Sequence, residues 1–257
     1  MLSLTSGQLE AWFVQYFFPF IRIGACFLAA PVFAANFVPA RVRLLLAGAV
    51  AIIIGPLIPV PAITPFSIEG VIATVQQIII GVAVAFVLQL IFDALAMGGQ
   101  LLSNTMGLGF AYNVDPLRGV GTPVLGQLYM ILVTLTFLAL NGHLRLIELL
   151  AQSFTTLPSG AQGLGSEQLW NVVAWGSQLF SGAVMVALPG MTALLVVNLA
   201  FGVMSRAAPS LNLFAVGFPI SLIFGLIIIY IGLPAVQATF VGALGEAFGL
   251  IQGLLGQ

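Results

Sequence analysis

Two long runs without a charged residue constrain the fold of this chain most. The first covers residues 168–205, and the second begins after Arg206 and covers residues 207–245. About 20 helical residues cross the ~30 Å hydrocarbon core of a bilayer, so runs of this length predict transmembrane helices. Only 5% of the 257 residues are charged and 61% are hydrophobic, against roughly 25% charged residues in a soluble domain. The chain is therefore predicted to be an integral membrane protein.

The apolar positions form about six helical segments, which we expect to be arranged as hairpins in an all-α fold. Prolines such as Pro189 and Pro219 predict kinked or broken helices, because proline removes a backbone donor. We expect Asp93 to end the third segment and Pro234 to end the sixth. Residues 1–257 are interpreted as one membrane-embedded domain with a polar loop at 142–170. The expected segments are 9–30, 42–58, 71–92, 124–140, 172–203 and 211–233, followed by a short glycine-rich helix with a tight packing face.

A glycine-rich stretch at residues 97–127 interrupts the apolar pattern. Seven of its 31 residues are glycine. Glycine adopts positive φ at little cost, and proline disfavours helical geometry in the residue before it, so we predict a non-helical insert at residues 98–123. Irregular backbone at membrane depth is tolerated only where protein buries it or where it lines a water-filled cavity. The insert is therefore a candidate gate, filter or plug.

Two arginines and a group of glutamines are unusual for apolar sequence. Arg22 lies near the middle of the first segment, where an arginine facing lipid costs about 2.5–3.5 kcal/mol, so it should face protein or water. It snorkels, meets backbone carbonyls, or forms an ion pair with a buried acid such as Asp93. Arg206 pairs with an acid of a neighbouring subunit, caps helix carbonyls before Pro209, or anchors the chain at the cytoplasmic surface. In the third segment the polar residues Gln76, Gln77 and Gln89 are expected to bridge helices by hydrogen bonds rather than to form a substrate site.

The sequence lacks the residue patterns of common enzymes. It contains no lysine, no G-x-S-x-G, no H-E-x-x-H and no phosphate-binding loop motif. Cys26 and His143 are single, so we expect no cofactor, no metal site and no catalysis, and the scattered arginines make nucleic-acid binding unlikely. Asp93 and Asp115 would still be able to carry protons, which keeps a secondary transporter as an alternative.

The positions of the arginines also predict how the chain is oriented in the membrane. With the N-terminus outside, four arginines fall in cytoplasmic connections and only Arg145 falls outside, as the positive-inside rule favours. The four are Arg41, Arg43, Arg118 and Arg206. The N-terminus lacks the basic region of a cleaved signal peptide, so the first segment is expected to be retained.

Two motifs resemble those of the FliR family, the inner-membrane component of the flagellar type III export gate. The first is Met106-Gly-Leu-Gly-Phe-Ala-Tyr-Asn-Val-Asp-Pro, with Pro123-Val-Leu-Gly; the second is Ser205-Arg-Ala-Ala-Pro-Ser-Leu-Asn-Leu-Phe-Ala-Val-Gly-Phe-Pro219. The resemblance covers essentially the whole chain. The gate residues matched to it are Met106, Gly107, Leu108, Gly109, Phe110, Asp115 and Pro116. The candidate assembly residues are Arg22, Asp93, Arg206, Pro209, Asn212, Gly217 and Pro219.

The resemblance implies a non-enzymatic subunit that assembles with FliP and FliQ, and with FlhB and FlhA, to export unfolded flagellar proteins. It places the chain in the bacterial inner membrane, in the flagellar basal body, with part of the assembly raised towards the periplasm. A virulence injectisome gate is the alternative. We hypothesise that Met106, Leu108 and Phe110 form an apolar constriction that blocks ions and yields to an arriving polypeptide. Alternatively, these residues only pack a re-entrant loop.

Overall fold

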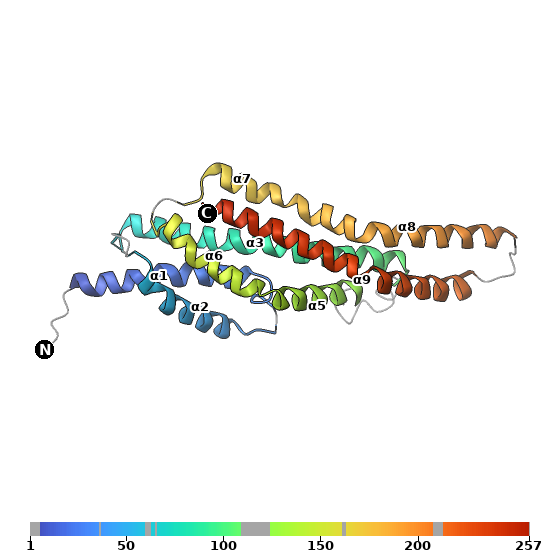
Figure 1. The fold of residues 1–257 in the computed structure, drawn as a ribbon, viewed down its shortest axis with the longest axis horizontal. Coiled ribbons are helices and arrows are strands. Elements are labelled where there is room, and N and C mark those ends of the chain that lie inside the picture. The colour runs from blue at the N-terminus through green and yellow to red at the C-terminus, as the bar shows by residue number, and fades with distance from the viewer. Residues whose placement is uncertain are drawn as a thin grey trace. The chain divides into compact units, whose positions relative to one another are not determined.

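The chain is built from helices. The computed structural model describes residues 6–35, 37–59, 63–64, 66–108, 124–160, 163–207 and 213–256, and within these ranges it has no β-strand (Figure 1). The elements are α1 (Ser6–Ala29), α2 (Ala40–Ile54), the short 3-10 helix η1 (Gly55–Leu57), α3 (Ile68–Thr105), α5 (Val124–Ala139), α6 (Gly142–Thr156), α7 (Ser166–Trp175), α8 (Ser177–Ala207) and α9 (Leu213–Leu254). The prediction of an all-α fold is confirmed.

The number of apolar segments also agrees with the prediction. Among the described residues, five helical stretches are long and apolar enough to cross a membrane. A sixth is counted if α5 and α6, which meet at an angle of 62°, form one bent span. The bend lies at Asn141, which has a positive φ of 56°. The chain therefore has the helix content of a membrane protein with about six spans.

The fold consists of two compact units. The first contains residues up to Gln89, then Phe137–Gly176 and the residues from Gly245 onward. The second contains Leu90–Thr136 and Ser177–Leu244. Each unit combines segments that are far apart in the sequence, and helices α3, α5 and α9 contribute residues to both. This division was not anticipated from the sequence.

In the first unit, α1 packs against α2 and α3. A Cβ added to Gly24 would lie 3.9 Å from Cβ of Ala47, and Gln15 donates a hydrogen bond to the carbonyl of Gly55, so α1 and α2 run antiparallel. At Gly81, on α3, an added Cβ would lie 3.0 Å from the backbone nitrogen of Cys26. The absence of a side chain at Gly81 thus lets α3 approach the backbone of α1 closely.

In the second unit, α3 continues beyond its predicted end. We expected Asp93 to end the helix and residues 98–123 to be non-helical, but α3 extends to Thr105. An added Cβ at Gly99 would lie 2.8 Å from the carbonyl oxygen of Leu125, and one at Gly98 would lie 3.0 Å from that of Ala183. These two glycines allow close packing against α5 and α8 rather than a break in the helix, so this boundary was wrong.

Two further boundaries differ from the predictions. Pro234 does not end the sixth segment, because α9 continues through Pro219 and Pro234 to Leu254 and includes the glycine-rich tail. The polar loop expected at 142–170 contains α6 and the first part of α7. Proline inside a long apolar helix is tolerated where neighbouring groups satisfy the freed backbone atoms. The glycine face at the end of α9, formed by Gly245, Gly249 and Gly253, was expected to pack tightly. A Cβ added at any of these glycines would meet no described atom within 4 Å, so this face has no packing partner among the described residues.

Candidate functional site

Arg22 lies at the centre of a buried hydrogen-bond network in the first unit. Its Nε donates to Oε1 of Gln77 at 2.7 Å, and one terminal nitrogen donates to Oγ of Ser153 at 2.8 Å. The other terminal nitrogen donates to the backbone carbonyl of Leu157 at 2.8 Å. The guanidinium carbon lies 4.0 Å from the centre of the Phe154 ring. A single side chain therefore connects α1, α3 and α6.

The structure identifies the environment and the hydrogen-bond partners of Arg22. Arg22 is fully buried, so of the two expected environments, protein or water, the structure gives protein. Among the described residues its hydrogen-bond acceptors are neutral oxygen atoms, not the carboxylate of an acid such as Asp93. Leu157 is the C-cap residue of α6, and the carbonyls at a helix C-terminus carry partial negative charge. The end of α6 thus supplies the electrostatic complement to the guanidinium.

The segment between α6 and α7 is held against α3 beside this network. Within the polar loop predicted at 142–170, Ser159 and Leu164 are nearly buried. The Gly163 backbone lies so close to the Gln76 side chain that a Cβ there would collide with the amide. Gln77 bridges helices as predicted, although its Nε2 has no hydrogen-bond partner among the described atoms. Sequence reasoning did not identify Ser153, Phe154 or Leu157, because only the folded chain brings them to Arg22.

The start of the proposed gate segment is a helix terminus of defined geometry. Leu108 donates its backbone N–H to the carbonyl of Ser103 at 3.1 Å, and Gly107 donates to that of Asn104 at 3.1 Å. With φ of 82° at Gly107, this is the Schellman arrangement of a glycine after a helix C-terminus. The expectation that glycine provides positive φ in this stretch therefore holds at Gly107.

Met106 is buried rather than exposed in the chain. Its side chain is 1% exposed and packs on α9 at Gly225, where an added Cβ would lie 2.6 Å from its Cγ and 2.7 Å from its sulfur. Leu108 is partly buried. Met106 therefore holds the beginning of the segment against α9, and its part in an apolar constriction stays a prediction.

The remaining candidate residues are scattered along the helices or undescribed. Gly109, Phe110, Asp115, Pro116, Pro209 and Asn212 lie outside the described residues. Asp93 is partly buried on α3 in the second unit. Arg206 is exposed in the last turn of α8, where a cation complements the helix dipole. Gly217 and Pro219 lie in α9, and Pro219 is exposed.

The described residues contain no cluster of metal-ligating side chains. No group of three or more His, Cys, Asp or Glu residues lies close enough to hold a metal ion in this part of the chain. Cys26 is a buried free thiol among apolar residues. The Arg145–Glu148 pair, with an N–O distance of 2.8 Å, is exposed and joins neighbouring turns of α6. The two arrangements that stand out are therefore the Arg22 network and the anchored start of the glycine-rich segment.

Comparisons with known proteins show relatives that match most or all of the chain. Residues 13–247 match the family described as bacterial export proteins, family 1. The flagellar biosynthetic protein FliR of Escherichia coli (strain K12) is 37% identical over 257 residues, which cover 100% of this chain and 98% of the relative. The protein of that name from Pectobacterium carotovorum is 37% identical with the same coverage. The one from Bacillus subtilis (strain 168) is 26% identical over 82% of each chain.

Proposed function

Because the chain belongs to the FliR family of bacterial export proteins, we propose that it is a subunit of the flagellar type III protein export gate. The observation that carries the proposal is the similarity to flagellar proteins along the whole chain, not over one motif. The names of these relatives favour flagellar cargo over the virulence effectors of an injectisome. The role proposed for this subunit is to help form and seal the pore through which unfolded flagellar proteins leave the cytoplasm.

The proposed partners are FliP and FliQ, with FlhB and FlhA in the surrounding apparatus of the bacterial inner membrane. Exposed apolar surface supports an assembly. In the most apolar windows of Ser166–Ala207 and Gly217–Leu254, only 17% and 22% of the residues are buried within the chain. Apolar surface of this extent is covered by lipid or by other subunits in a stable membrane protein. The chain alone thus leaves apolar surface that partner subunits would be able to cover.

Co-purification tests the assembly. The chain is expressed with and without FliP and FliQ from the same genome, and the mass of each purified species is measured by light scattering in detergent. We expect a large complex that contains all three proteins. Recovery of the chain alone despite co-expression, together with binding of a small solute, would favour the secondary-transporter alternative instead.

The proposed seal begins at the segment anchored by Met106. The contact of Met106 with Gly225 fixes one end of the glycine-rich segment to α9, so the residues that follow are the ones we propose to close the pore. An apolar constriction blocks ions because water leaves it, without any charged filter. Phe110 is among the residues that follow Met106 and is proposed to contribute to the apolar constriction. Met106 is proposed to hold the segment in place.

Ion conductance of the assembled complex tests the seal. A deletion of residues 109–119 keeps Met106, Gly107 and Leu108 and so preserves the end of α3. We expect this deletion to raise the conductance of the complex in planar bilayers at least tenfold. The exposed Arg145→Ala variant is the control and should leave conductance unchanged. A deletion variant that assembles and stays as tight as the wild type would refute the seal while leaving the assembly role intact.

A further inference from the structure

The last turns of α3 dock onto α8 and α9 through two buried side chains. Leu102 and Met106 are four residues apart, so they lie on the same face of α3, and both are buried. At Gly190 of α8 an added Cβ would lie 2.7 Å from Cδ1 of Leu102. At Gly225 of α9 one would lie 2.6 Å from Cγ of Met106. Each side chain thus fills the space that a side chain on the facing helix would take.

Apolar packing alone holds this end of α3 against the two helices. The hydroxyl of Thr105 and the backbone N–H groups of Met106, Gly107 and Leu108 all donate to carbonyls of residues 102–104, within α3 itself. Among the described residues, no hydrogen bond joins residues 102–108 to α8 or α9. Separation of the turn from these helices would therefore leave no hydrogen bond of its own broken, and a buried polar group without a partner is the costly case.

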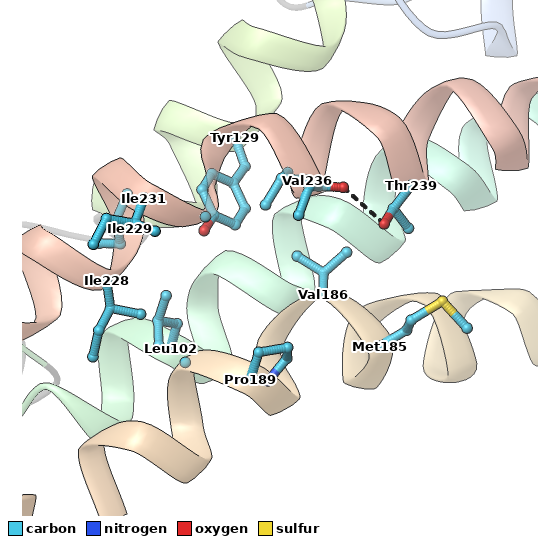
Figure 2. A pocket seen from close by; sticks show the side chains of 13 residues that line it. Leu102, Tyr129, Met185, Val186, Pro189, Ile228, Ile229, Ile231, Val236 and Thr239 are labelled. Carbon is cyan, nitrogen blue, oxygen red and sulfur yellow. Dashed lines mark hydrogen bonds between the residues drawn. The ribbon is translucent and has the colours of Figure 1, made fainter.

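A hollow beside the Leu102 contact gives the turn room to move. An apolar pocket of about 260 Å³ lies within the second unit, and Leu102, Pro189, Gly190 and Ile228 are among the residues that line it. Figure 2 shows Leu102 of α3 between Pro189 of α8 and Ile228 of α9. Protein interiors are normally close-packed, so a side chain beside an open space changes its position without first displacing its neighbours. Pro189 also removes a backbone hydrogen bond from α8, which weakens that helix where it receives Leu102.

We propose that the last turn of α3 is a releasable latch. The pore is closed while Met106 occupies the space at Gly225, and Met106 leaves α9 when a polypeptide is exported. Methionine suits a contact that breaks and re-forms, because its unbranched side chain adapts to irregular surfaces. Glycine suits the receiving position, because alanine there would already collide with Met106. This inference rests on the export function proposed above.

A disulfide that locks the latch tests the proposal. The Cβ of residue 106 is one carbon–carbon bond from Cγ, so the Cβ atoms of Met106→Cys and Gly225→Cys lie within the ~4.5 Å that a disulfide allows. The double variant replaces the wild-type gene in the host, in a Cys26→Ala background. Copper phenanthroline oxidises the pair in living cells, and labelling with a maleimide-linked polymer measures the oxidised fraction. We expect oxidation to lower flagellin secretion at least fivefold and dithiothreitol to restore it.

A second cysteine pair is the matched control. An added Cβ at Gly24 would lie 3.9 Å from Cβ of Ala47, so Gly24→Cys with Ala47→Cys joins α1 to α2 by the same chemistry away from the latch. Oxidation of this pair should leave flagellin secretion within twofold of its reduced level. Full oxidation of M106C/G225C with unchanged secretion would overturn the latch, as would an equal fall in both strains. Secretion by the reduced strains would still support the export function in either case.

Ion conductance decides if the reduced M106C/G225C strain does not secrete. Gly225→Ala places a methyl group where Met106 lies, whereas Gly242→Ala adds one to α9 where a Cβ meets no described atom within 4 Å. Each variant is purified with its partner subunits, and the assembled complex is measured in planar bilayers. We expect the conductance of the G225A complex to exceed that of the G242A complex at least threefold, because the latch no longer seats. Equal conductance of the two complexes would overturn the proposal.

Discussion

Arg22 combines a buried charge with neutral hydrogen-bond partners. Removing a guanidinium from water is costly, and the structure offsets this cost with three short hydrogen bonds, an aromatic face and the C-terminal end of α6. Arginine suits this position because its planar fork reaches the three acceptors from three different nitrogen atoms, whereas the donors of lysine all lie on one nitrogen. From the sequence we predicted that Arg22 faces protein or water, but its partners lie 55 to 135 positions away along the chain and only tertiary packing identifies them.

Replacing Arg22 should destabilise the first unit. In Arg22→Ala, two buried acceptors and one part-buried acceptor lose their donor, at about 1–3 kcal/mol for each buried group left unsatisfied. We expect the melting temperature in detergent, followed by tryptophan fluorescence, to fall by at least ~4 °C, since ~1 kcal/mol shifts a chain of this size by about 2–4 °C. Arg22→Lys should recover only part of the loss. The exposed Arg41→Ala is the control, and an equal melting temperature for R22A and R41A would contradict the role given to the network.

At the scale of elements, the interpretation of glycines as helix breakers gave the largest error in a helix boundary and also one correct prediction. Gly98 and Gly99 were interpreted as helix breakers, yet both lie inside α3 where α5 and α8 approach it. Gly107, in the same stretch, does end the helix with positive φ. Composition does not distinguish a glycine needed for packing from one needed for backbone conformation, because the difference depends on which helix lies opposite. The six apolar segments were predictable because their hydrophobicity is a property of the local sequence.

A pair of alanine substitutions separates the two uses of glycine. In Gly99→Ala the new methyl group would lie 2.8 Å from a backbone oxygen of α5, so the helices must move apart. Overpacking of this kind costs about 1–3 kcal/mol, whereas alanine at the unobstructed Gly242 of α9 should gain up to about 1 kcal/mol from helix propensity. We expect lower stability for G99A and equal or higher stability for G242A in thermal unfolding. A stabilised G99A would show that α3 and α5 are not packed as described.

At the scale of the whole molecule, the membrane class and the family were both predictable, and the division into two units was not. Absence of charge over long runs is visible in the sequence, and the motif from Ser205 to Pro219 indicated the family that the comparisons confirm. The two units are assembled from distant segments, with α3, α5 and α9 contributing to both. No local pattern encodes such an arrangement.

Export of flagellar proteins tests the central claim most directly. The gene for this chain is deleted in its own host, and flagellin and hook protein are measured in the culture medium before and after complementation with the wild-type gene. We predict that secretion is lost on deletion and restored by complementation, while the same proteins remain detectable inside the deletion cells. Unchanged secretion of flagellar proteins in the deletion strain would contradict the assignment of this chain to the flagellar export gate.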